Sequence, residues 1–181
     1  MRLNNLGLLA AGVCVATFAL GTILATNATA DVFTLISSID EAQANEGNGT
    51  GSAATGSATA TYDDATGEFA WNIQWTPLEG NITVAHFHGP AAPGANAGVQ
   101  VNFGAISGLT SPSAGSTNIT AQQANDLLGG LWYINIHSDR DAVTMGGEIR
   151  GQVLLIPEPA TLVTFAVMLL GTATCRWRRR Q

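Results

Sequence analysis

The chain has 181 residues, and its 13 acidic side chains outnumber seven arginines, with no lysine, for a net charge of −6. Between Asp31 and Ile156, twelve acids face two arginines, so this segment alone carries a net charge of −10. Such a surface repels phosphate backbones and anionic lipid headgroups, which excludes nucleic acid as a partner. It is compatible with divalent cations or a polymer matrix, and equally with a role in solubility alone.

The first 30 residues predict a secretory signal peptide. Arg2 provides a positive start, residues 6–24 are apolar and uncharged, and Ala28-Thr29-Ala30 forms a small-x-small cleavage site. We therefore expect signal peptidase to cut after Ala30. The alternative is an uncleaved transmembrane helix, because the apolar run is long for a signal peptide.

Residues 31–156 are expected to form one domain without disulfides. The two cysteines, Cys14 and Cys175, both lie outside this segment. An exported domain of this length must then be stabilised by its core and its hydrogen-bonded sheets. A cysteine nucleophile is excluded for the same reason.

The first half of this segment predicts strands. Residues 32–39 are rich in apolar and β-branched side chains, whereas residues 41–56 have the composition of a loop. Residues 57–62 alternate, residues 63–67 have turn composition, and Phe69, Trp71, Ile73 and Trp75 then occupy every second position. This period of two predicts a hairpin whose aromatic face dominates the core.

The second half adds strands at residues 82–88, 98–103, 131–137 and 148–155. Thr120 and Gln123 form a capping pattern that opens a short helix to Leu128, where Gly129-Gly130 stops it. Short strands at intervals of about 8–12 residues, with one short helix, predict an all-β Greek-key sandwich. The expected type is immunoglobulin-like or Cu,Zn superoxide dismutase-like.

Three stretches carry a family resemblance. They are residues 80–91 with His86-Phe87-His88-Gly89-Pro90, residues 131–138 with His137, and residues 146–153 with Gly147-Glu148-Ile149-Arg150-Gly151. In this order they resemble the CHRD domain, over residues 33–155. The resemblance implies that these histidines, glycines, Pro90, Glu148 and Arg150 are family motif positions in an exported bacterial domain. We expect no enzymatic activity, because the sequence has no phosphate loop, nucleophile elbow or serine triad signature.

The histidines are candidate metal ligands. His86 and His88 are two positions apart on an expected strand, so they share a face, with Ile82 and Val84 on that same face. His137 ends another strand, and three imidazoles so placed suit Cu or Zn. The arrangement is similar to the copper side of Cu,Zn superoxide dismutases. The alternative is that these side chains hydrogen-bond backbone groups near the end of the sheet.

Four charged residues have less specific roles. Asp139 and Asp141 are either oxygen ligands beside His137 or caps of a turn. Glu148 and Arg150 share a strand face, and a structural ion pair between them is the expected use.

The last 25 residues predict a sorting segment. Pro157-Glu158-Pro159 interrupts regular structure, residues 160–175 carry no charge, and a basic cluster follows at residues 176–180. This order resembles the PEP-CTERM signal of Gram-negative bacteria. It implies processing by an exosortase, with a precursor tethered in the inner membrane and a mature form at the cell surface or in the extracellular matrix. The alternative is a plain tail anchor.

These inferences divide the chain into a signal peptide (1–30), a β-sandwich domain (31–156) and a sorting segment (157–181). The favoured function is a structural, adhesive or binding role in the envelope, with exopolysaccharide or other envelope proteins as partners. The alternative is a periplasmic or surface Cu- or Zn-binding protein with redox activity.

Overall fold

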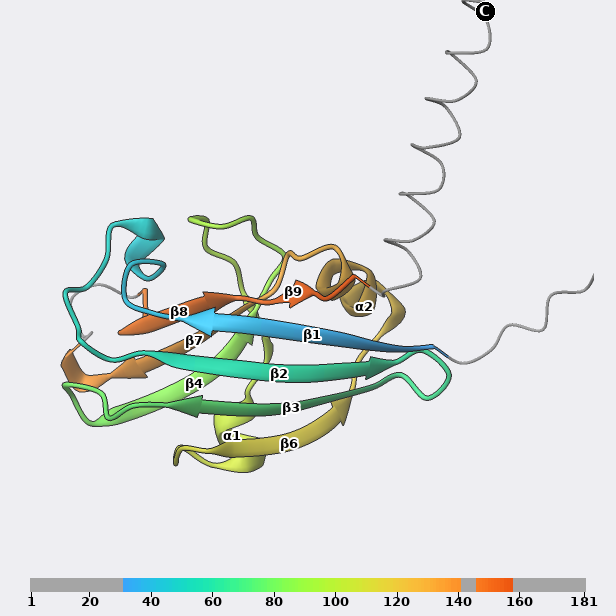
Figure 1. The fold of residues 1–181 in the computed structure, drawn as a ribbon, viewed down its shortest axis with the longest axis horizontal. Coiled ribbons are helices and arrows are strands. Elements are labelled where there is room, and N and C mark those ends of the chain that lie inside the picture. Colours follow the sequence, from blue (N-terminus) through green and yellow to red (C-terminus); the bar gives the residue numbers. More distant parts are fainter. Residues whose placement is uncertain (1–30, 141–145, 158–181) are drawn as a thin grey trace, which may run out of the picture.

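Two antiparallel sheets form the fold in the computed structural model, which describes residues 31–140 and 146–157. One sheet has the strand order β6-β3-β2-β1-β9 and the other the order β5-β4-β7-β8 (Figure 1). The strands are β1 (Val32–Ile39), β2 (Gly56–Asp63), β3 (Glu68–Trp75), β4 (Ile82–His88), β5 (Val99–Val101), β6 (Ser113–Asn118), β7 (Tyr133–Ser138), β8 (Ile149–Gln152) and β9 (Leu154–Leu155). The predicted all-β sandwich is confirmed.

The predicted terminal segments lie mostly outside the described residues. The cleavage site at Ala28 and Ala30 falls there, as do Glu158 and Pro159 of the sorting motif. Within residues 31–140 and 146–157, no helix has the length and apolar character needed to cross a membrane.

The aromatic face of β3 forms the centre of the core, as its alternation predicted. Phe69 and Ile73 are fully buried and Trp71 is nearly so. The ring of Phe69 meets Phe87 of β4 edge-on at 5.0 Å and Trp132 at 5.6 Å, so it joins the two layers. Aromatic pairs of this kind add about 0.5–1.5 kcal/mol each beyond the burial of their area.

Local signals set the hairpin and the main helix. Strands β2 and β3 pair antiparallel from Gly56↔Trp75 to Tyr62↔Phe69, as predicted. Helix α2 (Ala121–Leu128) begins at Thr120, whose side chain accepts from the Gln123 N–H while the Gln123 side chain accepts from the Thr120 N–H. The capping box satisfies N–H groups that the first turn of a helix leaves without partners.

Three elements were not predicted. Helix α1 (Phe103–Ser107) follows β5, and β6 pairs with β3 from Glu68↔Asn118 to Ile73↔Ser113. A short 3-10 turn, η1 (Asn45–Gly47), lies in the loop between β1 and β2. The β6 sequence is Ser-Ala-Gly-Ser-Thr-Asn, which has no apolar alternation, so only its backbone pairing makes it a strand.

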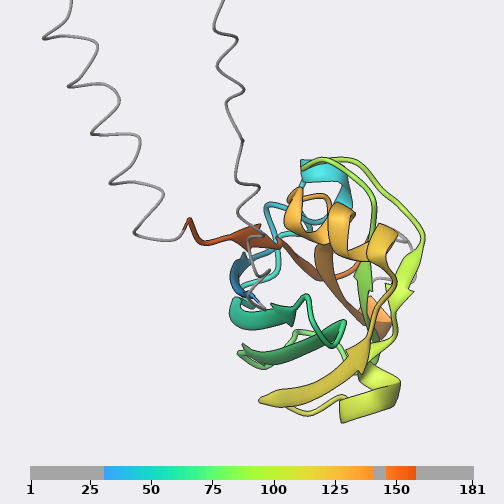
Figure 2. The ribbon, with the colours of Figure 1, turned by 90° about the vertical axis from the view of Figure 1, so that its right-hand side faces the viewer.

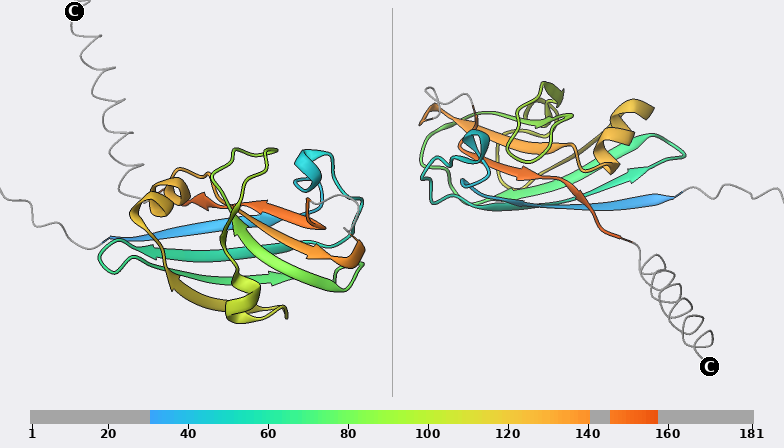
Figure 3. Two further views of the ribbon diagram at one scale, coloured as in Figure 1. Left: turned by 180° about the vertical axis from the view of Figure 1, so that it is seen from behind. Right: turned by 90° about the horizontal axis from the view of Figure 1, so that it is seen from above.

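The two layers approach closely at β8. A Cβ atom at Gly151 would lie within 2.7 Å of Ile39 and would collide with backbone and side-chain atoms of Ser38 and Ser37. Glycine therefore permits the contact between β8 and β1, and the end-on view shows the sheets closing on each other (Figure 2). Seen from behind, β4 and β7 form the opposite face, and the chain that follows β4 crosses it (Figure 3).

Candidate metal centre

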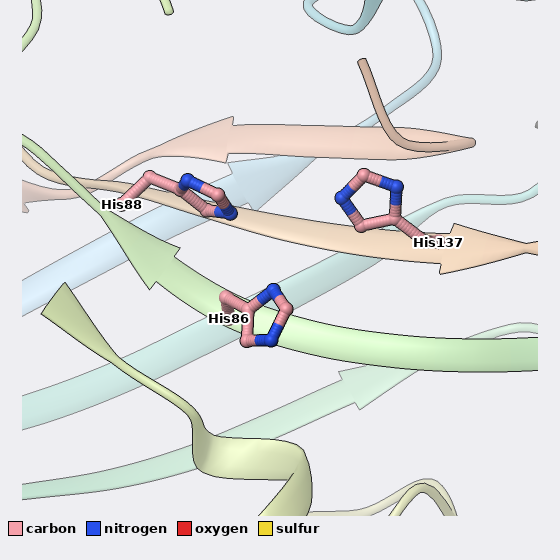
Figure 4. A group of neighbouring side chains, drawn as sticks. All are labelled: His86, His88 and His137. Carbon is pink, nitrogen blue, oxygen red and sulfur yellow. The ribbon is translucent and has the colours of Figure 1, made fainter. Parts of the chain in front are cut away.

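The three histidines lie on the outer face of the four-stranded sheet. In β4, Ala85 and Phe87 are buried in the core, so the alternating His86 and His88 point away from it. In β7, Ile134 and Ile136 are in the core, which places His137 on the same outer face. Because β4 and β7 are hydrogen-bonded neighbours, the predicted set is brought together (Figure 4).

The distances between the imidazoles suit a single ion. One ligand nitrogen from each of His86, His88 and His137 lies within 4.8 Å of the others. The ring centroids are 5.4 Å apart for His86 and His88, 6.3 Å for His86 and His137, and 6.5 Å for His88 and His137. To bind one zinc ion, each of the three nitrogens would have to lie about 2.0–2.1 Å from it, so the rings would have to move closer together.

The environment keeps these side chains neutral. Burial, followed by the neighbouring His88 and His86, lowers the pKa of His137 to about 4. Burial is also the main cause of a lowered pKa at His86 and at His88. At neutral pH each imidazole therefore keeps an unprotonated nitrogen, the form that binds metal.

Two ring nitrogens are buried without a partner among the described residues. The Nδ1 of His88 lies 3.0 Å from the carbonyl oxygen of Ala97, which leaves its Nε2 buried and unbonded. The Nδ1 of His86 is also buried and unbonded. Buried polar atoms normally have partners, and a ligand histidine normally donates its second N–H to a carbonyl group. The pattern at His88 is that of a ligand with an oriented ring.

The alternative use of the histidines, hydrogen bonding to backbone, accounts for one ring only. His88 makes such a contact at Ala97, whereas the orphaned nitrogen of His86 has no backbone acceptor or donor. Asp139 was expected to be either an oxygen ligand or the cap of a turn, and it caps a turn, accepting from the N–H of Asn81 at 2.9 Å and its side-chain amide at 2.8 Å. Asp141 lies outside the described residues.

Ile82, which was predicted to lie on the histidine face, lies on the core face of the sheet. Val84 is on the histidine face and 40 % exposed, but Ile82 packs against the core. The β4–β7 register shifts between Ile82 and Val84, which marks a bulge. An extra residue in one strand reverses the facing of the residues that precede it, so the assignment of Ile82 to the histidine face was wrong.

A second layer of side chains supports the cluster from β7 and β8. The Tyr133 ring stacks on His88 at 5.1 Å, with an interplanar angle of 12°, and the Arg150 guanidinium carbon lies 3.5 Å from the Tyr133 centroid. The backbone of Ala97 fixes both rings, because its N–H donates to the Tyr133 hydroxyl at 3.0 Å and its carbonyl meets His88.

The expected ion pair between Glu148 and Arg150 is absent. Glu148 is fully buried, and its carboxylate accepts from the hydroxyls of Ser52 and Ser138 and from the backbone N–H groups of Glu79 and Gly80. Burial acts to raise the pKa of Glu148, but these four hydrogen bonds outweigh it and lower the pKa. Glu148 therefore joins the loops at Ser52 and at Glu79 to the end of β7, and it does not neutralise Arg150.

The remaining motif residues shape the backbone around the site. Gly147 has φ +77°, and a Cβ atom there would collide with the side-chain oxygen of Asn135. Gly89 packs against the Trp132 ring, and the cis peptide bond between Gly89 and Pro90 starts the loop that crosses the histidine face. These positions fix backbone geometry and offer no ligand atoms.

Two residues of this face were not predicted from the sequence. Tyr133 and Asn135 alternate with Ile134 and Ile136 and so lie beside His137, and the side-chain oxygen of Asn135 is buried without a partner. The period of two in residues 131–137 was a signal that would have placed them on the histidine face.

Comparison with known protein families matches residues 35–153 to the CHRD domain. The chain belongs to the CHRD domain family. CHRD domains are of the extracellular and secreted type, which is consistent with an exported protein. No curated protein and no solved structure matches the chain.

Proposed function

We propose that this CHRD domain is an exported binding module for a transition metal ion, held by His86, His88 and His137. The observation that carries the proposal is the convergence of three neutral imidazoles, two of which keep a buried nitrogen without a partner. Three imidazoles suit copper or zinc, whereas calcium and magnesium prefer oxygen ligands. The sandwich supplies rigid strands that hold the ligands in place.

The test is calorimetric titration of the purified, demetallated protein with Cu(II), Cu(I) and Zn(II) at neutral pH. We expect one ion to bind per chain. His137→Gln removes one of three ligands and should weaken binding at least 100-fold. Val84→Gln is the matched control, because it adds the same side chain to the same face at an exposed position. No heat with any of the three ions would refute the proposal.

Export and sorting complete the proposal. The apolar N-terminal segment, which ends in Ala28-Thr29-Ala30, supports passage through the inner membrane. The tail supports exosortase processing, because it combines Pro157-Glu158-Pro159 with a basic end. Fractionation of native cells expressing the chain with and without residues 157–181 tests this. An unprocessed protein that stays embedded in the membrane would favour the plain anchor.

A second candidate function is binding to a neutral matrix polysaccharide. The outward side chains of the five-stranded sheet are uncharged along most of its length, and include Thr59, Thr61, Asn72 and Gln74. At one end they meet a cavity of about 420 Å³ lined by hydroxyl and amide groups and by Trp75, with no charged residue. In a domain of net charge −10, this surface favours a neutral glycan over an anionic one.

Native gel electrophoresis through dextran or alginate tests the second candidate. We expect dextran to retard the protein and alginate to have little effect. Gln74→Glu places a charge in the cavity and should remove the retardation, whereas His137→Gln should leave it unchanged. Equal migration of the wild type with and without dextran would exclude this role for that polymer.

A further inference from the structure

Arg150 is a buried cation with no carboxylate partner in the part of the chain that the structure describes. Its side chain is 1 % exposed, and the ion pair found within residues 31–140 and 146–157 joins Arg140 to Glu79 instead. The guanidinium has only long contacts to amide oxygens, at 3.3 Å to Asn96 and 3.5 Å to Gln152, besides the Tyr133 ring. Buried charges are normally paired because removing them from water is costly.

Nearby acids do not neutralise this charge. Glu46 reaches Arg150 only through Asn96, whose amide donates to the Glu46 carboxylate at 3.0 Å, and Glu46 is exposed, so water screens it. The Asp40 backbone pairs with that of Arg150, but the Asp40 carboxylate accepts from Gln43. The Glu148 carboxylate is held by two serines and two backbone N–H groups.

The cation is coupled to the histidine cluster through Tyr133. The guanidinium carbon lies 3.5 Å from the Tyr133 centroid, and that centroid lies 5.1 Å from the His88 ring. The guanidinium carbon is therefore at most 8.6 Å from the His88 centroid, which is the sum of those two distances. The stack of Arg150, Tyr133 and His88 is held in place by Ala97. Its N–H donates to the Tyr133 hydroxyl, and its carbonyl oxygen contacts His88.

Among residues 31–140 and 146–157, the ligand set offers no negative charge to offset a divalent ion. The cluster consists of three neutral imidazoles, and Asp139, which directly follows β7, caps a turn with Asn81. A divalent ion would thus keep both its charges beside the Arg150 cation, whereas a monovalent ion would meet half the repulsion.

We propose that Arg150 makes the three-histidine site selective for monovalent copper, Cu(I), over Cu(II) and Zn(II). This inference rests on the proposed metal-binding function. Two unit charges about 10 Å apart at an effective dielectric constant of about 20 repel each other enough to change an equilibrium about 15- to 20-fold. The ratio of the Cu(II) dissociation constant to the Cu(I) dissociation constant should therefore fall by that factor when the Arg150 charge is removed. Arg150 thus acts as a specificity-determining residue without touching the ion.

The experiment compares dissociation constants for Cu(I) and Cu(II) in the purified full chain. Cu(I) is titrated anaerobically against a chromophoric chelator, and Cu(II) against a competing ligand in calorimetry. We expect the wild type to bind Cu(I) more tightly than Cu(II), and Arg150→Met to shift the ratio toward Cu(II) by about 15- to 20-fold. Arg150→Lys keeps the charge and should restore most of the preference.

Arg140→Met is the matched control. It removes the same charge from an exposed arginine that is already paired with Glu79, so the ratio should change less than about 3-fold. A wild type that binds Cu(II) more tightly than Cu(I), or a folded Arg150→Met with an unchanged ratio, overturns the inference. If Arg150→Met does not fold, the wild-type ratio alone decides. Absence of binding by any ion is a different outcome and refutes the proposed function itself.

Discussion

Replacing Glu148 by glutamine removes the charge from the most highly bonded side chain near the site. One carboxylate oxygen accepts from the Ser52 hydroxyl at 2.6 Å and the Glu79 N–H at 2.7 Å. The other accepts from the Ser138 hydroxyl and the Gly80 N–H. In glutamine, one of these oxygens becomes an NH₂ group that faces two donors.

The free-energy cost of Glu148→Gln depends on which of the four hydrogen-bond donors can reorient. A serine hydroxyl can rotate and accept from the new NH₂ group, but a backbone N–H cannot, so Glu79 or Gly80 loses its acceptor. Bonds to a charged acceptor contribute about 1.5–3 kcal/mol, and a buried unsatisfied donor costs about 1–3 kcal/mol. We therefore expect Glu148→Gln to lower the free energy of unfolding by roughly 3 kcal/mol, a large share of the roughly 5–15 kcal/mol typical of a domain.

Urea denaturation measures this loss. With a slope of about 2 kcal/mol per molar urea, the midpoint should fall by roughly 1.5 M. Glu68→Gln is the control, since Glu68 is exposed on β3 and should change stability by less than about 0.5 kcal/mol. A midpoint that moves no further for Glu148→Gln than for Glu68→Gln would show that the buried carboxylate does not stabilise the loops.

Protonation of Glu148 at low pH should also lower the stability of the protein. The folded-state pKa of Glu148 lies below its ordinary value, so its contribution to stability is complete above the ordinary pKa and is lost as pH falls through the folded pKa. The stability of the wild type should therefore approach that of Glu148→Gln in acid. A difference that stays constant down to pH 2 would contradict this assignment.

The other predictions concern the turn before β8, the core and the site. Gly147→Ala should cost about 2–3 kcal/mol in urea denaturation, because its φ of +77° is strained for alanine and the new Cβ collides with Asn135; a neutral result would mean that this turn relaxes freely. Phe69→Ala should cost about 3–5 kcal/mol, against less than about 0.5 kcal/mol for Ile36→Ala on the exposed face, and similar values for both would contradict the assigned core. Because the pKa of His137 is lowered to about 4 and the pKa values of His86 and His88 are also lowered, a drop from pH 7.5 to 5.5 should weaken metal binding less than about 100-fold, against roughly 1,000-fold for three ordinary histidines. Calorimetric titration at the two pH values checks this, and a loss close to the larger factor would show that the imidazoles are not kept neutral.

Elements with strong local signals could be predicted from the sequence. The β2–β3 hairpin has an alternating pattern on both sides of a turn, and helix α2 has its own capping residues at Thr120 and Gln123. Such signals depend on neighbours a few residues away in the chain. Strand β6 has no such signal, because its polar residues become a strand only by pairing with the backbone of β3.

The candidate site could be predicted only in part. The spacing of His86 and His88 correctly placed both on one face, but the face of Ile82 depended on a bulge that no local pattern indicates. The roles of Glu148 and Arg150 were inferred from their shared face, and the structure instead gives each a different set of partners from distant loops and from β7.

By itself, the sequence determined the class of fold, the cysteine-free domain, the resemblance to its family and the identity of the three imidazole donors. These properties depend on composition, on short-range periodicity and on motif order, all of which are present in the linear chain. Only the tertiary structure decided that His137 lies beside His86 and His88, that Arg150 is buried without a carboxylate, and that Tyr133 connects them. These are set by the register of β4, β7 and β8 and by the loop through Ala97, because hydrogen bonding between strands distant in the chain aligns residues that no local rule relates.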